Sequence, residues 1–294
     1  GPDGRRISSE RDLPTIWGPD TGVAWRTPLR GLGVSSPIVS GDLVFLTSQL
    51  GRGPMRPGGH PTLVRGGAES SDDERPLGGA RVDGAGDSVR FLVSAFDRRD
   101  GHLVWEYELA AEGDQPQAHQ KHNMASPSAV WDGERVYAWF ATGQLVALDL
   151  AGELVWQRHL GRDHGSYEIV WGHSSSPGLY RDLIILQSDH ENGAYILALD
   201  RHSGQPRWKA DRGPALRSFS TPLVVAGPNG DELVVNANAG LDGYDPSTGE
   251  WLWHADGHNE YPIAAATFDE AGMVYTARGH RAGPYLAVRL GGRG

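Results

Sequence analysis

The 294-residue sequence contains no cysteine and only three methionines. Without a thiol, the chain cannot form a disulfide, a thiolate metal site or a cysteine nucleophile. Basic residues are also outnumbered, since 27 Lys and Arg face 37 Asp and Glu and leave a formal net charge of −10. This balance argues against a general nucleic-acid-binding protein, which carries a basic surface. No apolar run approaches the roughly 18 residues that a membrane-spanning helix needs, so we expect no transmembrane segment.

Glycine and tryptophan are abundant, with 41 and 10 copies, and 22% of the residues are charged. This composition is typical of a soluble globular chain rather than a disordered one. The apolar runs are short or alternating, as at residues 43–46, 135–139 and 183–186, and no long segment has helical periodicity. The pattern therefore predicts an all-β fold.

One motif occurs four times. It begins with a small residue, an apolar residue and Asp, continues with a Gly three or four residues after the Asp, and ends with a Trp four residues after that Gly. Its aspartates are Asp97, Asp149, Asp200 and Asp245, and its tryptophans are Trp105, Trp156, Trp208 and Trp253. Asp accepts hydrogen bonds from nearby backbone N–H groups, and Gly adopts left-handed conformations, so the motif predicts a tight turn between two strands. The fixed position of the tryptophans predicts structural packing between repeats rather than ligand stacking. The recurrence of the aspartates likewise favours turn formation over calcium binding.

A second marker opens each repeat. It is Ser36-Pro37, Ser126-Pro127, Ser176-Pro177 or Thr221-Pro222. Two strands (A and B) follow it, and the motif joins two more (C and D). Four strands repeated every 45–52 residues predict a β-propeller of four-stranded antiparallel blades. We expect one domain over residues 1–294, with about four full blades and two partial ones, Trp25 ending an earlier unit.

Residues 51–89 lengthen the first repeat by about 30 residues. They fall between strands B and C and are rich in glycine. We expect a loop insertion on the surface, and the alternative is a lid or docking arm.

The repeated motif resembles the tryptophan-docking motif of the PQQ-like β-propeller superfamily, and in particular the bacterial PQQ-binding-like repeat proteins. The resemblance covers nearly the whole chain, from residues 1–4 to residues 286–292. It implies a periplasmic or otherwise extracytoplasmic bacterial protein and an incomplete ring, because family members usually continue through further blades. An open arc exposes strand edges and apolar faces, so we expect it to self-associate or to be less stable than the full-length protein.

The superfamily includes quinoprotein dehydrogenases and a propeller lipoprotein that helps to assemble outer-membrane proteins. The dehydrogenases typically carry a vicinal cysteine pair, which this chain lacks, and their calcium ligands and catalytic Asp cannot be assigned here by motif. We therefore expect a non-catalytic scaffold without a cofactor. The alternative is a PQQ-dependent oxidoreductase that uses PQQ and calcium.

Most of the histidines fall in the D–A and B–C connections, which share one face of a propeller. The candidates for a ligand-binding face are His122, His173, Asp189, His190, His258, Glu260 and His280. Three interpretations remain open: exposed loop residues, a surface that recognises a protein, peptide, glycan or small ligand, and a metal or catalytic centre. Metal ligation needs several such groups within about 2 Å of the ion, which these spacings do not demand. We predict that His122, His173, His190 and His258 lie on one face, nearer the propeller axis than the C–D turns.

Overall fold

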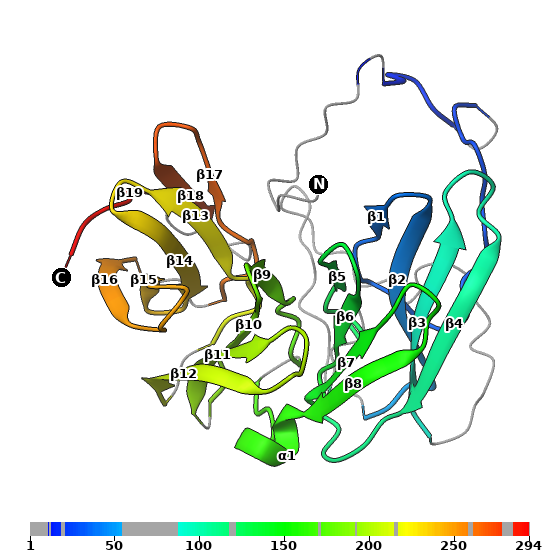
Figure 1. The fold of residues 1–294 in the computed structure, drawn as a ribbon, viewed down its shortest axis with the longest axis horizontal. Helices are drawn as coiled ribbons and strands as arrows, with labels where there is room; N and C mark the ends of the chain where they lie inside the picture. The colour runs from blue at the N-terminus through cyan, green and yellow to red at the C-terminus, as the bar shows by residue number, and fades with distance from the viewer. Residues whose placement is uncertain are drawn as a thin grey trace, which may run out of the picture.

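Five antiparallel sheets follow one another along an arc, with the first at the right of Figure 1 and the fifth at the upper left. The computed structural model describes residues 11, 13–18, 21–54, 88–117, 122–169, 172–191, 193–214, 217–257, 261–277 and 285–293. Most of the predicted insertion at 51–89 therefore lies outside the described residues. So do three of the predicted site residues, namely His258, Glu260 and His280.

Each sheet is one blade. Blade 1 contains β1 (Ile38–Ser40), β2 (Leu43–Leu50), β3 (Arg90–Asp97) and β4 (Leu103–Ala110). Blade 2 contains β5 (Val130–Trp131), β6 (Val136–Trp139), β7 (Gln144–Leu148) and β8 (Leu154–His159). Blade 3 contains β9 (Gly178–Tyr180), β10 (Leu183–Ser188), β11 (Ala194–Asp200) and β12 (Pro206–Gly213). Blade 4 contains β13 (Leu223–Gly227), β14 (Gly230–Ala237), β15 (Gly240–Tyr244) and β16 (Trp251–Asp256), and blade 5 contains β17 (Thr267–Phe268), β18 (Met273–Ala277) and β19 (Tyr285–Arg289). Neighbours in sequence are neighbours in each sheet, so the all-β, four-stranded blade prediction is confirmed for blades 1–4.

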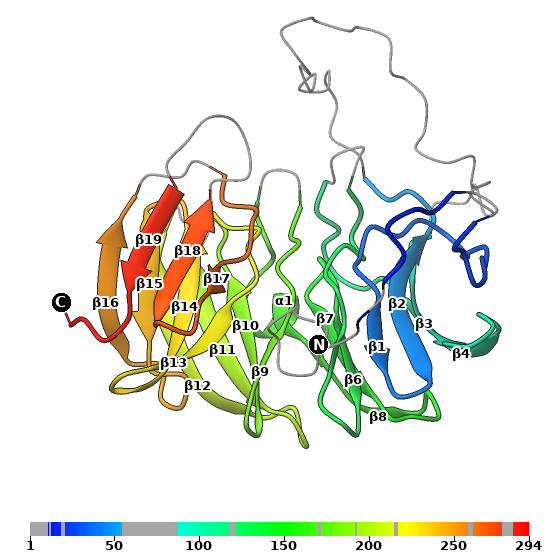
Figure 2. The same cartoon turned by 90° about the horizontal axis from the view of Figure 1, so that it is seen from above.

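The first strand of each blade lies on the inside of the arc and the last strand of blades 1–4 lies on its outside (Figure 1). Strands run between two edges of the arc, and the β1–β2 turn lies at the lower edge in Figure 2. We call the edge with the A–B and C–D turns the turn face, and the edge with the B–C and D–A connections the loop face. The only helix among the described residues is α1 (Leu160–His164), in the D–A connection after β8. No helix of the described part is long and apolar enough to cross a membrane.

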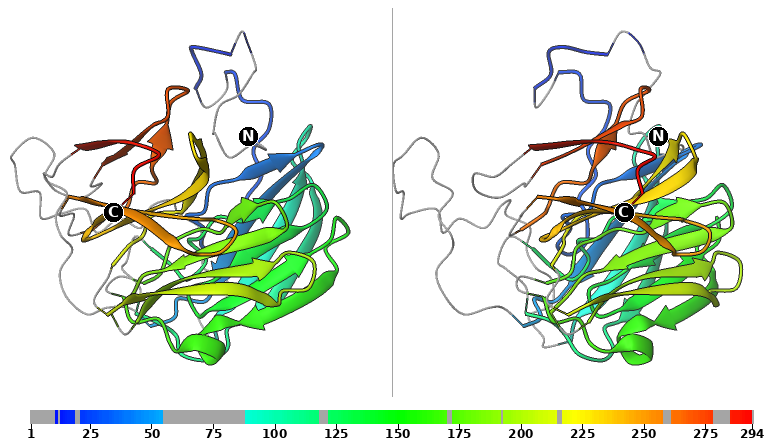
Figure 3. Two further views of the ribbon diagram at one scale, coloured as in Figure 1. Left: turned by 60° about the vertical axis from the view of Figure 1, so that its left-hand side comes forward. Right: turned by 90° about the vertical axis from the view of Figure 1, so that its left-hand side faces the viewer.

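The core lies between blades rather than within them. All six residues of β10 are buried, whereas β12 alternates between exposed and half-buried positions. The reason is that the middle strands have a blade on each side, while the outermost strand also borders solvent. Between blades 1 and 2, for example, Phe91 and Phe140 stack with ring centroids 4.3 Å apart. Blade 5 packs against blade 4 in the same way, at the end of the arc (Figure 3).

Three of the four motif tryptophans donate a hydrogen bond to the C–D turn of the next blade. The indole N–H of Trp156 donates to the carbonyl of Arg201 (3.0 Å), directly after the motif residue Asp200. Trp105 and Trp208 make the equivalent bonds to Leu150 (2.8 Å) and Pro246 (3.1 Å). The motif glycine of the next blade forms the platform for the ring: a Cβ on Gly204, whose φ is +68°, would lie 2.8 Å from Trp156. Asp, Gly and Trp therefore recur together because each blade's turn receives the indole of the previous blade.

Trp25 makes the same contact on blade 1, since its indole N–H donates to the carbonyl of Arg98 at 2.8 Å. The interpretation of Trp25 as the end of an earlier unit agrees with this geometry.

Trp253 also packs against the next blade, but its hydrogen bond differs from those of the other three. Its indole N–H donates to the carboxylate of Glu232 in its own blade, at 2.6 Å. The register of blade 5 gives the reason. Arg289 pairs with Met273 as Asp97 pairs with Leu43, so an arginine occupies the place of the turn-forming Asp. Within the described residues, blade 5 therefore lacks the Asp-Gly turn that receives the indole in blades 1–4.

Candidate functional site

The four described residues of the predicted ligand face lie in connections of the loop face around blade 3. His173 lies in the D–A connection after α1, and Asp189 and His190 begin the B–C connection after β10. His122 lies in the preceding D–A connection, and its charge acts on His173. The structure therefore brings these four residues into one region.

His173 and His190 lie among three aromatic side chains, and we call these five residues the histidine cluster: Trp139, Tyr167, His173, His190 and Tyr195. The ring of His173 lies 4.1 Å from that of Trp139 and 5.1 Å from that of Tyr167, centroid to centroid. The ring of His190 lies 5.5 Å from Tyr167 and 6.1 Å from Tyr195. Only 1% of His173 and 3% of His190 is exposed, so neither side chain lies open on the surface.

Both histidines are held in the neutral form. The pKa of His173 is lowered to about 3. Burial is the main cause, and the neighbouring charges of His190 and His122 contribute to the same shift. Burial also lowers the pKa of His190. Within the described part of the chain, Nε2 of His173 and both ring nitrogens of His190 have no hydrogen-bond partner. A proton added to either ring would therefore create a buried charge without a bonded acceptor, which is costly.

Asp189 points into an ion network between blades 3 and 4. Its carboxylate lies 2.9 Å from Nε of Arg212, and Nε2 of Gln187 donates to it at 2.7 Å. Arg212 also pairs with Asp242 (3.1 Å), and its Nη1 donates to the hydroxyl of Tyr244 (2.9 Å). The side chains of Asp189 and Arg212 are 0% and 1% exposed. Burial raises the pKa of Asp189, but Arg212 opposes this effect, and charged groups at this distance stabilise each other.

This network places Asp189 in the interior, where it is already bound. Removing one partner of such a pair leaves an uncompensated buried charge and costs about 3–5 kcal/mol. A role in holding blades 3 and 4 together fits these contacts better than contact with a ligand.

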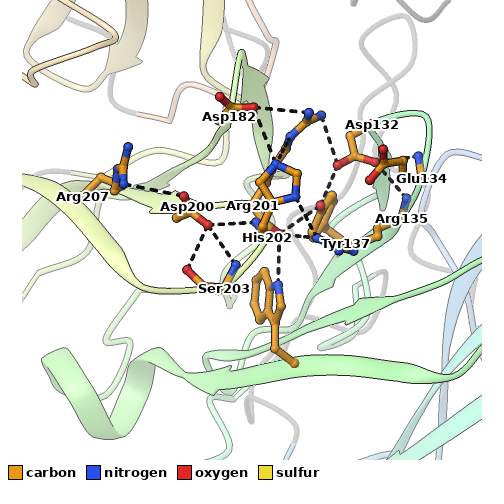
Figure 4. Close-up of polar contacts among 11 residues, drawn as sticks. Asp132, Glu134, Arg135, Tyr137, Asp182, Asp200, Arg201, His202, Ser203 and Arg207 are labelled. Carbon is orange, nitrogen blue, oxygen red and sulfur yellow. Dashed lines mark hydrogen bonds and ion pairs between the residues drawn. The ribbon is translucent and has the colours of Figure 1, made fainter.

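A second polar network joins blades 2 and 3 on the turn face (Figure 4). The Asp132 carboxylate accepts a hydrogen bond from the Tyr137 hydroxyl (2.6 Å) and lies 3.3 Å from Nη1 of Arg201. Nη2 of Arg201 lies 3.3 Å from Asp182, so one guanidinium bridges turns of both blades. Burial alone would raise the pKa of Asp132, but the hydrogen bonds from Tyr137 and two backbone N–H groups hold it below its usual value. The arginine whose carbonyl receives Trp156 is thus fixed from both sides.

The motif aspartates act within their own turns. The Asp149 carboxylate accepts hydrogen bonds from the backbone N–H groups of Ala151 and Glu153, both at 2.9 Å. Within the described residues, Asp97, Asp100 and His102 are close enough to share an ion. They are the exposed C–D turn of blade 1, and His102 is already paired with Asp100 at 2.7 Å. These contacts favour turn formation.

A cavity of about 230 Å³ lies beside α1, between the connections that follow β4 and β8. It is lined by Gly113, Asp114, Thr142, His159, Gly161, Arg162 and Ser166. Its imidazole is bound within the protein, since Nε2 of His159 lies 3.0 Å from the carbonyl of Glu112 and Nδ1 accepts from the Arg162 N–H. Arg162 also pairs with Glu112, and the Thr142 hydroxyl donates to Gln144, so these two polar groups of the lining are bound within the protein as well.

Sequence reasoning missed Trp139, Tyr167, Arg212 and Asp242. None of them belongs to the repeated motif, and Asp242 meets Arg212 only because blade 4 packs against blade 3. The one available signal was Trp139 itself, a tryptophan outside the docking position.

Four-stranded blades joined by indole-to-turn docking define this chain as a PQQ-like β-propeller. A family model described as outer membrane protein assembly factor BamB matches residues 7–177 and 90–279, and the chain belongs to this family.

Relatives and solved structures agree with this assignment. The outer membrane protein assembly factor BamB of Alkalilimnicola ehrlichii is 25% identical over 178 residues, which are 60% of this chain and 41% of the relative. The crystal structure of BamB from Moraxella catarrhalis superposes with a TM-score of 0.56 at 18% identity, covering 92% of this chain and 63% of that one. The quinohemoprotein alcohol dehydrogenase of Comamonas testosteroni gives 0.51 at 14% identity, covering 84% and 40%. The structural likenesses show a shared fold, and the chain spans about two fifths of the curated relative's length.

Proposed function

We propose that this protein is a non-catalytic scaffold of outer membrane protein assembly, which binds a protein partner through its loop face outside the bacterial cytoplasm. The observation that carries the proposal is the match to the BamB family over residues 7–279. The curated relative and one of the solved structures bear the same name.

The state of the candidate acid and base groups supports a binding role. Asp189 is bound by Arg212 and Gln187, and His173 is enclosed by aromatic rings. Groups that transfer protons must reach a substrate within hydrogen-bond distance. The buried side chains of Asp189 and His173 instead hold the loop-face connections in place, and loops on a rigid scaffold are suited to recognition.

The loop face also offers exposed positions close to this base. Glu168 is exposed, and its backbone carbonyl accepts the N–H of Glu191 at 2.8 Å, so two connections are joined there. Glu191 in turn pairs with Arg217 of the next D–A connection at 2.9 Å. The connection between blades 2 and 3, the B–C connection of blade 3 and the connection between blades 3 and 4 thus meet in one polar surface, which can contact a protein partner.

Site-specific photo-crosslinking in the source bacterium tests the proposal. A photoreactive residue replaces Glu168 on the loop face or, as the matched control, the exposed Glu134 on the turn face. We expect adducts with a component of the outer-membrane assembly machinery, or with an outer-membrane protein precursor, from position 168 and not from position 134. Equal adducts from both positions, or none from position 168, would refute the loop-face scaffold.

The alternative is a quinoprotein oxidoreductase, and the same purified chain can test it. The likeness to the alcohol dehydrogenase concerns the fold, and the sequence has no cysteine for a vicinal pair. PQQ and calcium are added, and quinone absorbance and dye reduction with an alcohol are measured. We expect neither signal, and saturable reduction would favour the enzyme.

A further inference from the structure

We propose that the histidine cluster makes the loop face pH-dependent, keeping the connections after α1 and β10 closed when both imidazoles are neutral and releasing them when the imidazoles take up protons. This inference rests on the proposed function in one respect, because it concerns regulation of the surface assigned to the partner. Its structural part stands independently of any partner.

The cluster joins separate segments of the chain. His173 belongs to the connection after α1, His190 to the connection after β10, and Trp139 to the end of β6. Tyr167 contacts all three of them, and the Tyr195 hydroxyl, from β11, lies 3.5 Å from its own. Displacing either histidine therefore loosens both connections, together with the bond between the Glu191 N–H and the Glu168 carbonyl.

Among the described residues, no carboxylate is paired with either ring, and the backbone hydrogen bond at Ser175, which favours the charged form of His173, does not outweigh burial. Asp189, the nearest buried carboxylate along the chain, is bound to Arg212 and Gln187. The described titratable and charged groups around the cluster are His122, His164, Asp163, Arg158, Tyr167, Glu168, Asp189, Glu191, Tyr195, Lys209, Asp211, Arg212, Arg217 and Asp242. The neighbours His122 and His190 both act to lower the proton affinity of His173.

The direction of the pH effect follows from the protons bound by the two forms. In the closed form the histidines have lowered pKa values, whereas in an open, hydrated form they return to about 6.5. The open form therefore binds more protons once the pH falls below about 6.5. At pH 5.0, His173 with its pKa of about 3 in the closed form favours opening by about 30-fold relative to neutral pH, and at pH 7.5 the effect vanishes. His190 acts in the same direction.

Hydrogen exchange of the full chain, measured by mass spectrometry at pH 7.5 and pH 5.0 and corrected for the intrinsic rates, tests the inference. We expect peptides from residues 165–177 and 187–194 to exchange at least 10-fold faster at pH 5.0. Peptides from the turn face, such as residues 200–206, should not change. Equal corrected exchange of the loop peptides at both pH values would overturn the inference.

Variants identify the groups responsible. His173→Phe combined with His190→Phe keeps aromatic rings in the cluster but removes both titrating nitrogens, and should abolish the pH effect. His102→Ala is the matched control, because His102 lies exposed on the turn face, and it should retain the effect. The same acceleration in the double variant would overturn the inference. If the double variant does not unfold cooperatively at pH 7.5, the single variant His190→Phe replaces it, with at least half of the effect expected to be lost.

Crosslinking at position 168, repeated at both pH values, separates this inference from the proposed function. A pH-dependent exchange without adducts at pH 7.5 would refute the scaffold role alone. Adducts with an unchanged exchange rate would refute the switch alone.

Discussion

The junction between blades 2 and 3 and the junction between blades 4 and 5 are built from the same repeat and differ in how the tryptophan is used. Trp156 crosses to the next blade, where it meets Gly204 and the carbonyl of Arg201. Trp253 packs against blade 5, but its indole N–H donates to Glu232 in its own blade. The difference shows that docking requires the receiving turn as much as the tryptophan.

The receiving side also differs in its polar contacts. Arg201 is bound by Asp132 and Asp182, so the turn that accepts Trp156 is fixed in place (Figure 4). In blade 5, Arg289 stands in the place of the turn-forming Asp. Tyr285, on the side of this sheet that faces away from blade 4, is 86% exposed. We therefore expect substitutions at the junction of blades 2 and 3 to lower the free energy of unfolding strongly, and substitutions at the junction of blades 4 and 5 to affect only local contacts.

The largest effect is expected for Trp156→Ala. It removes the ring that fills the space between blades 2 and 3, and large-to-small substitutions of this kind cost about 3–5 kcal/mol. Urea denaturation measures the loss. An unchanged midpoint would show that this tryptophan is not a docking residue.

A pair of glycine substitutions isolates the platform for the ring. Gly204→Ala combines a left-handed φ with overlap of the Trp156 ring, and we expect a cost of about 2–4 kcal/mol. Gly272→Ala is the control, because its φ is +77° and nothing lies within 4 Å of the added Cβ. Backbone strain alone predicts about 1–2 kcal/mol there. Equal losses in urea denaturation would mean that ring contact contributes nothing.

The bond between Trp253 and Glu232 is tested by a double-mutant cycle with Trp253→Phe and Glu232→Met. Hydrogen bonds to charged groups contribute about 1.5–3 kcal/mol, and we expect a coupling free energy of this size. The same cycle with Trp156→Phe in place of Trp253→Phe should be additive within about 0.5 kcal/mol. Additivity in both cycles would contradict the separate role of Trp253.

The smallest effect on stability is expected for Tyr285→Lys. Its side chain is exposed on the outward side of blade 5, so the free energy of unfolding should change by less than about 0.5 kcal/mol. If this surface mediates self-association, the added charge should lower the molar mass seen by light scattering. A loss above 2 kcal/mol would show that Tyr285 is part of the folded core.

Much of the fold could be predicted from the sequence. The Asp-Gly-Trp spacing indicated four-stranded blades, and the turn between strands C and D follows from the hydrogen bonds of residues such as Asp149. Packing between blades is confirmed for Trp253 as well, but its hydrogen-bond partner was not predictable, because that partner depends on the next blade's turn rather than on its own repeat. The site was only partly predictable: the positions of His173 and His190 followed from the connections, but their burial did not.

The sequence by itself determined the local chemistry that recurs in every blade. An Asp side chain reaches backbone N–H groups two to four residues away, and Gly adopts the required φ wherever it occurs. Only the tertiary structure decided which polar groups became neutral, paired or enclosed. Arg212 meets Asp189 within its own blade and Asp242 from the next one, and Trp139 of blade 2 covers His173. Burial and ion pairing depend on the groups that neighbouring blades place within a few ångströms, and no spacing along the chain specifies that distance.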